Sequence, residues 1–181
     1  ALILHTQQGR LIGHIARDST AIEARERFEG SAKHKSIPKR KRGRPRKSER
    51  ALSGRRLPRQ RRQNLAEMLE ELPRHCSLGV KTSSKGYQQY WRGYKLHVDV
   101  ADGQIPITCL LTAARLHDSQ VAIPLATLTA ARVTSLYDLM DAAYDAKEIR
   151  EHSRSLGHVP LISPAPRHQF TCQKVKLRQN S

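Results

Sequence analysis

Alternation and clustering of hydrophobic positions predict strands in both halves of the chain. Residues 11–22 form a β-branched and aliphatic run that contains Asp18, which predicts a buried strand ending in a functional or capping carboxylate. Residues 90–101 alternate between apolar and polar side chains, so we expect a strand with one apolar face and one exposed polar face. The apolar side holds Leu96, Val98 and Val100, and the polar side holds Lys95, His97 and Asp99. Residues 104–114 are also strand-like, and the intervening Asp102-Gly103 predicts an antiparallel hairpin.

Helical spacing and capping residues predict three helices. In residues 64–73 four apolar side chains share one helical face, Asn64 and Glu67 form a capping box, and Pro73 ends the helix. A second helix is expected over residues 121–133, with Asp118 or Ser119 as its cap. A third is expected over residues 145–156, closed by Gly157.

The remaining strands complete a layered pattern. Residues 134–142 predict a buried strand that ends at Asp141, and residues 159–163 predict another short strand. The order hairpin, helix, strand, helix, strand predicts an α/β fold with a mixed sheet. At 181 residues and 38% hydrophobic content, the chain has material for one modest core.

Charge is concentrated in one segment. The chain has 33 Lys+Arg against 16 Asp+Glu, a net charge of +17, which indicates a polyanionic partner. Residues 39–62 hold thirteen of these cations and one acid, and a block of like charges without apolar periodicity is expected to be solvated. We therefore divide the chain into a first part of the core (1–38), a basic linker (39–63), the remainder of the core (64–163) and an unstructured tail (164–181).

The basic linker contains a short motif. The run Arg42-Gly43-Arg44-Pro45-Arg46-Lys47 resembles the AT-hook, in which Gly and Pro keep the strand thin enough to enter a narrow A·T minor groove. A non-specific basic tether is the alternative. The candidate DNA-binding residues are Lys39, Arg40, Lys41, Arg42, Gly43, Arg44, Pro45, Arg46, Lys47, Arg55, Arg56, Arg59, Arg61 and Arg62.

Other features bear on location. The sequence has no apolar run of membrane-spanning length and no signal-peptide pattern, so we expect a cytoplasmic, nucleoid-associated protein. The three cysteines have no C-x-x-C pair and are expected to be free thiols.

Two carboxylates stand where predicted strands leave an apolar environment. Acids such as Asp18 and Asp141, at the ends of neighbouring strands, can converge on divalent metal ions in two-metal phosphoryl-transfer sites. A helix cap or turn is the alternative for each. His97 and Asp99 are expected on an exposed strand face, with metal binding as the alternative. His117-Asp118 is expected to form a capping turn, with a role in the site as the alternative. Trp91 and Tyr94 either stack on a base or pack internally.

Residues 93–125 and 139–149, together with the stretch from His14 to Glu26, resemble the catalytic core of DDE transposases of bacterial insertion sequences. The resemblance implies an RNase-H-like fold, with Asp18 as the first catalytic aspartate. Asp141 matches the second, because it opens the family's D-x-x-Y-D motif with Tyr144 and Asp145.

The resemblance also implies the chemistry. Such enzymes cleave a DNA phosphodiester at transposon ends with water and then transfer the freed 3′-OH, assisted by Mg²⁺ or Mn²⁺. The family's third carboxylate, a Glu on a helix after the fifth strand, has no counterpart, because residues 152–181 contain no Asp or Glu. We therefore expect a truncated or frame-changed member that does not transpose. A non-catalytic AT-hook-like DNA-binding protein and a degenerate fragment remain alternatives, and a homodimer is possible.

Overall fold

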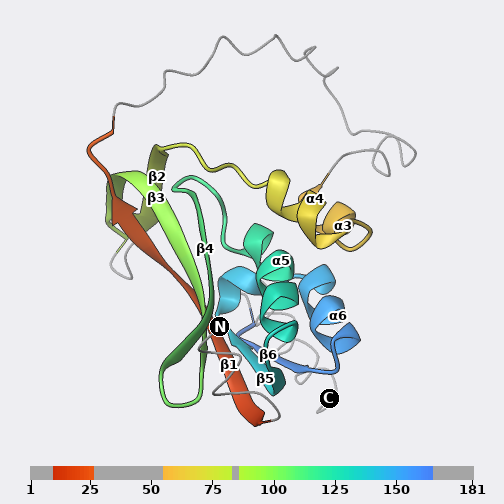
Figure 1. Ribbon diagram of the computed structural model, residues 1–181. Coiled ribbons are helices and arrows are strands. Elements are labelled where there is room, and N and C mark those ends of the chain that lie inside the picture. Colours follow the sequence, from red (N-terminus) through yellow and green to blue (C-terminus); the bar gives the residue numbers. More distant parts are fainter. Residues whose placement is uncertain (1–9, 27–54, 83–85, 165–181) are drawn as a thin grey trace, which may run out of the picture.

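The computed structural model describes residues 10–26, 55–82 and 86–164, which form a mixed six-stranded sheet with helices (Figure 1). The strands are β1 (Leu11–Glu23), β2 (Ser77–Thr82), β3 (Gln88–Ala101), β4 (Ile105–Ala113), β5 (Thr134–Met140) and β6 (Val159–Ile162). The helices are α3 (Arg56–Gln60), α4 (Leu65–Glu70), α5 (Ser119–Ala130) and α6 (Lys147–Ser155), with a 3₁₀ turn η1 (Ala142–Tyr144). Within these ranges no helix is long and apolar enough to cross a membrane.

Strand β1 lies at the centre of the sheet. It pairs antiparallel with β3 on one side and parallel with β5 on the other, and β5 pairs parallel with β6. The long strand β3 pairs along its other edge with β2 over its first half and with β4 over its second half. The predicted α/β class with a mixed sheet is therefore confirmed.

The helices lie together on one side of the sheet (Figure 1). Side chains on that side are buried, including Ile15, Arg17, Met140 and Ile162. Residues at the intervening positions point to the opposite side and stay more exposed, as with Leu161 at 49%. Among the described residues the sheet thus has one covered face and one open face.

The predicted capping box and hairpin are present. The Glu67 backbone N–H donates to Asn64 Oδ1 at 2.9 Å, and the Asn64 backbone N–H donates to Glu67 Oε2 at 3.0 Å. The hairpin between β3 and β4 has three loop residues, and both Gly103 and Gln104 have positive φ. The Asp102 carboxylate accepts from the Gly13 backbone N–H at 2.7 Å, so the turn is tied to β1.

Two elements were not expected from the sequence. Strand β2 pairs with β3, and helix α3 falls within the segment that we expected to be solvated. Helix α3 packs on the fold because Leu57 meets the core and the buried Gln60 side chain donates to the Gln120 carbonyl at 2.9 Å. The expectation of a solvated linker is therefore wrong for residues 55–62, while residues 39–54 lie outside the described ranges.

The polar side of β3 is the covered side, so the expected exposed face for His97 and Asp99 is wrong. Both side chains are fully buried at 0% exposure. Burial is tolerated because each has a polar partner: Asp99 is paired with Arg17, and His97 Nε2 lies 2.9 Å from Thr112 Oγ1. A charged group can occupy the covered face when its partner is buried with it.

Candidate active site

The register of β1 and β5 brings the two predicted catalytic aspartates to adjoining strand positions. Arg17 of β1 pairs with Met140 of β5 in the parallel ladder. Asp18 follows Arg17, and Asp141 follows Met140 at the point where β5 ends. Neighbouring parallel strands lie about 4.8 Å apart. Asp18 and Asp141 are 123 positions apart in the chain, yet the two strands that lead to them lie side by side.

Each aspartate is exposed and has one local hydrogen bond that fixes its orientation. Asp18 Oδ1 accepts from the Ser19 backbone N–H at 2.7 Å. Asp141 caps η1, and its Oδ1 accepts from the Ala143 backbone N–H at 2.9 Å. Asp141 is thus a cap at the local level, as the alternative interpretation predicted. Its carboxylate oxygens keep further lone pairs that face solvent.

A buried ion pair lies directly behind these positions. The Arg17 guanidinium binds Asp99 in a bidentate manner, with Nε to Oδ1 and Nη2 to Oδ2 both at 2.7 Å. Burial by itself lowers the pKa of Arg17, but the charge and hydrogen bonds of Asp99 outweigh it and raise the pKa, so Arg17 stays charged. Thr129 of α5 donates to Asp99 at 2.6 Å, and Arg17 Nη1 contacts the Met140 sulfur at 3.4 Å. These contacts join β1, β3, β5 and α5 next to Asp18.

Tyr144 is a buried core residue at the end of the η1 turn that Asp141 caps. Its ring is 1% exposed and packs in the core with Met140 and Ile149. Its hydroxyl has no hydrogen-bond partner among the described residues. Burial is the main cause of its raised pKa, and the nearby carboxylates of Asp118, Asp141 and Asp18 raise it further. The tyrosine therefore stays protonated as a neutral neighbour of three acids.

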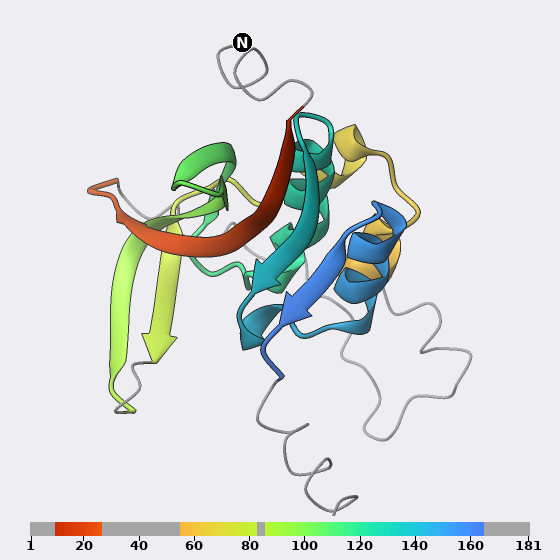
Figure 2. The same ribbon diagram turned by 90° about the horizontal axis from the view of Figure 1, so that it is seen from below.

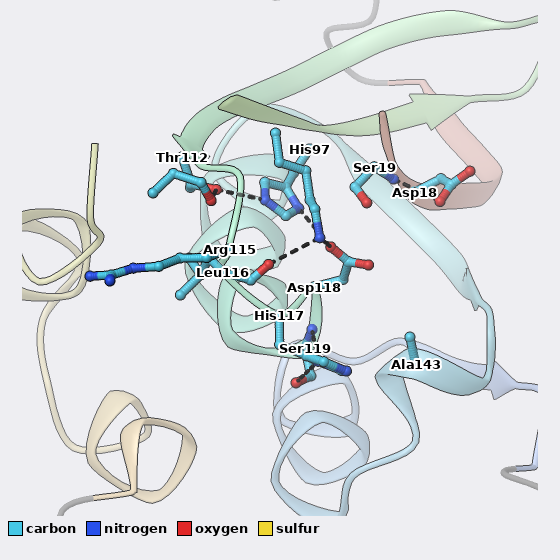
Figure 3. Close-up of polar contacts among 12 residues, drawn as sticks. Asp18, Ser19, His97, Thr112, Arg115, Leu116, His117, Asp118, Ser119 and Ala143 are labelled. Carbon is cyan, nitrogen blue, oxygen red and sulfur yellow. Dashed lines mark hydrogen bonds and ion pairs between the residues drawn. The ribbon is translucent and has the colours of Figure 1, made fainter. Parts of the chain in front are cut away.

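A second polar group lies across from Asp18, at the N-terminal end of α5 (Figure 3). Asp118 accepts from Lys95 Nζ at 2.9 Å, and the same ammonium donates to the Leu116 carbonyl at 3.0 Å. His97 Nδ1 lies 3.9 Å from Asp118 Oδ1, and burial lowers the pKa of His97 to about 4. Asp118 is the N-cap residue of α5, which was one of the two predicted caps, but its side chain makes no capping hydrogen bond.

Ser119, the first residue of α5, is in contact with His117. Its backbone N–H lies 3.3 Å from His117 Nδ1, and that nitrogen is also 2.8 Å from the Ser119 hydroxyl. The histidine therefore provides the local turn, and the Asp118 carboxylate is left to face Lys95. The sequence predicted a capping turn at His117-Asp118, with a role in the site as the alternative. The position of Asp118 between β4 and α5, at a strand-to-helix junction, is the signal that favours the alternative.

Asp18 and Asp141 supply some, but not all, of the ligands that a divalent cation requires. Two exposed carboxylates supply the hard oxygen ligands that Mg²⁺ and Mn²⁺ prefer. In the ranges that the structure describes, no group of three His, Cys, Asp or Glu side chains is arranged to hold a metal ion. The arrangement thus offers two of the ligands such a site requires.

The predicted DNA-binding residues divide into two sets. Lys39, Arg40, Lys41, Arg42, Gly43, Arg44, Pro45, Arg46 and Lys47 lie outside the described residues. Of the five in the described range, Arg55 and Arg62 are exposed, whereas three have partners within the fold. Arg56 donates to Gln120 at 2.7 Å, Arg59 binds Glu71 at 2.9 Å, and Arg61 pairs with Glu151.

Comparison with known proteins identifies the class. Residues 9–181 match the model of the family described as "Transposase DDE domain", and the chain therefore belongs to the DDE transposase family. No curated protein and no solved structure matches the chain. The sequence-based assignment to this family and to its RNase-H-like fold is confirmed. The family acts on DNA and generally uses divalent metal ions.

Proposed function

We propose that Asp18 and Asp141 are the two aspartates of the catalytic site of this transposase domain, and that they bind Mg²⁺ or Mn²⁺. The parallel register of β1 and β5 carries this proposal, because it places both acids at adjoining positions in a chain of the DDE family. When bound, the metal supplies Lewis-acid chemistry at a DNA phosphodiester, first for attack by water and then by the freed 3′-OH.

The protein's own groups have separate roles in this proposal. Asp18 and Asp141 supply oxygen ligands whose orientation is set by the Ser19 and Ala143 backbone N–H groups. The Arg17–Asp99 pair acts through the backbone as a positioning element, because it holds β1 against β3 beside Asp18. Two carboxylates leave the metal geometry poorly fixed, so we expect this chain alone to bind metal weakly and not to complete strand transfer.

We also infer that the basic segment binds DNA through its phosphates. Residues 39–54 hold eight Lys+Arg and one Glu, and each neutralised phosphate of a duplex adds about 0.9 to the salt slope. Deletion of residues 39–54 is the appropriate test, because residues 56–60 form helix α3 of the folded domain. A flatter salt slope supports the proposal, and an unchanged slope places the DNA footprint on the folded domain.

The metal proposal is tested by Mn²⁺ binding, followed by electron paramagnetic resonance. We expect Asp18→Asn and Asp141→Asn each to weaken binding at least about tenfold, the scale seen when support of a metal site is lost. Glu70→Gln is the matched control, because this acid is exposed on α4, a helix that carries neither of the proposed ligands. Equal Mn²⁺ affinity in all four proteins would refute the site assignment.

Activity distinguishes the alternative, a non-catalytic AT-hook-like DNA-binding protein. Its motif, Arg42 to Lys47, favours DNA binding that needs no metal. If the chain binds DNA in EDTA and Arg44→Ala does not change its preference for A·T-rich DNA, the segment is a non-specific basic tether rather than an AT-hook. Mg²⁺-dependent nicking that disappears in Asp18→Asn would show a catalytically complete protein and contradict the expectation of an incomplete site.

A further inference from the structure

The β2–β3 arm, which we define as residues 77–82 and 88–93, extends away from the helical layer (Figures 1 and 2). One face of the arm is packed. The Trp91 indole lies directly on Gly79, where an added Cβ would come within 2.4 Å of the ring. Trp91 is 9% exposed, and its Nε1–H donates to the Tyr94 carbonyl at 3.1 Å. The Trp91 ring therefore covers the inner face of the arm, and the outer face is available to a partner.

The outer face is both aromatic and apolar. Tyr90 pairs across the strands with Val80, and Arg92 pairs with Leu78. Tyr90 is 60% exposed, and Val80 and Leu78 are each 50% exposed. A tyrosine ring flanked by aliphatic groups on a paired strand forms a flat surface of the kind on which nucleic-acid bases stack.

The charge of this region is one-sided. Between Glu71 and Asp99 the sequence contains no Asp or Glu and five Lys+Arg. Two of these cations, Lys81 and Arg92, are exposed on the arm. Two described acids lie at the base of the arm: Glu23 of β1 pairs in register with Gly93, and Glu26 accepts from the Tyr94 hydroxyl at 2.6 Å. This charge complements a polyanion and repels a second copy of the same arm.

The outer face continues to Asp18. Strand register pairs Ile22 with Tyr94 and Asp18 with Val98, and side chains two positions apart share a face. Tyr90, eight positions from Val98 along β3, therefore lies on the same open face as Asp18, at roughly 26 Å from it. That length corresponds to about eight nucleotide steps of a DNA strand.

We propose that the β2–β3 arm binds the DNA strand that leads away from Asp18, stacking an unpaired base on Tyr90. Arg92, which shares the outer face with Tyr90, binds the neighbouring phosphate. The placement beside a cleavage site rests on the proposed function, whereas the binding itself needs neither metal nor the Asp18 and Asp141 carboxylates.

The test uses the full chain in EDTA, with a twelve-residue oligothymidylate that carries one 2-aminopurine at its centre. Stacking on Tyr90 quenches 2-aminopurine fluorescence, so we expect quenching with the unmodified chain and its loss in Tyr90→Ala. Fluorescence anisotropy of the same strand is expected to show affinity reduced about 5- to 150-fold by Tyr90→Ala, the range for one base stacked on an aromatic ring. Tyr90→Trp is expected to restore both signals.

Three controls separate stacking from other effects. Tyr137→Ala removes an exposed tyrosine of β5 and is expected to leave quenching unchanged. Trp91 is the only tryptophan, so an unchanged emission spectrum in Tyr90→Ala shows that the arm remains folded. Arg92→Ala is expected to lower the single-strand salt slope by about 0.7, the contribution of one phosphate.

The outcomes are distinct. Quenching that persists in a folded Tyr90→Ala protein would overturn the proposal, as would an effect of Tyr90→Ala on self-association rather than on DNA. If Mn²⁺ binding is independent of Asp18 while quenching depends on Tyr90, the metal-site assignment fails and the arm proposal stands. If Mn²⁺ binding depends on Asp18 while quenching does not depend on Tyr90, the arm proposal fails and the metal-site assignment stands.

Discussion

Replacement of Arg17 by methionine tests whether the ion pair behind Asp18 holds the sheet together. Methionine keeps much of the length and apolar volume of arginine and removes the charge. The change leaves Asp99, which is 0% exposed, without its counter-ion in the covered layer. Both hydrogen bonds that arginine made to this carboxylate, at 2.7 Å each, are lost as well. Among the described residues, the Thr129 hydroxyl is then the one side chain that still donates to Asp99.

The expected loss is large because a buried charge without its partner is costly. Removal of one member of a buried pair costs about 3–5 kcal/mol in the free energy of unfolding. A domain of this size loses about 2–4 °C in Tm for each kcal/mol, so the melting temperature should fall by about 6–20 °C. Arg59→Met is the control: it breaks the pair of Arg59 with Glu71, in which the arginine side chain is 48% exposed. We expect it to lower the free energy of unfolding by about 0–1 kcal/mol.

A double-mutant cycle completes the test. Urea unfolding, followed by circular dichroism, gives the free energies of unfolding of Arg17→Met, Asp99→Leu and the double variant. We expect the double variant to be more stable than Arg17→Met alone, because it buries no unpaired charge. An Arg17→Met protein as stable as Arg59→Met, or a double variant that loses the sum of both single losses, would refute the reasoning.

Three further predictions concern the same fold. Gly93→Ala should destabilise by more than about 3 kcal/mol in urea unfolding, because its Cβ would lie 2.1 Å from the Ile22 carbonyl oxygen, whereas Gly86→Ala, with open space, should lose about 1–2 kcal/mol. Because burial lowers the pKa of His97 to about 4 from the ordinary 6.5, the unfolded chain binds more protons between these values. Stability should therefore fall as the pH decreases from 6.5 to 4, by about 3 kcal/mol, and His97→Gln should remove most of that dependence; an unchanged pH profile would contradict it. Tyr144→Phe removes a buried hydroxyl without a partner among the described residues and should raise the unfolding free energy by about 1 kcal/mol, so a loss of stability would argue for a hidden partner.

Local sequence signals determined most of the individual elements. The capping box of Asn64 and Glu67, the positive-φ Gly157 after α6 and the Asp102-Gly103 turn each depend on residues close in sequence. Such interactions are decided within a few residues, so pattern and composition were sufficient to predict them. Strands were predictable wherever apolar residues ran together, as in β5 and β6.

The family, too, was readable from the sequence. Asp18 and Asp141 were predicted as its catalytic residues from their motifs, and the match over residues 9–181 confirms the family. Their adjacency in space, however, depends on the parallel register of β1 with β5, which no local pattern specifies. The sequence thus predicted which two acids are catalytic, and the sheet brings these two candidates to neighbouring strands.

Tertiary structure alone decided the short or polar elements. Strand β2 exists because β3 offers a free edge and Trp91 packs on Gly79, and helix α3 exists because Leu57 and Gln60 find partners on the folded domain. Likewise, the polar side of β3 faces inward because buried partners satisfy its charge, which reverses the simple rule that polar residues face water. In each case the deciding free energy comes from residues far apart in the chain, and only the folded arrangement brings them together.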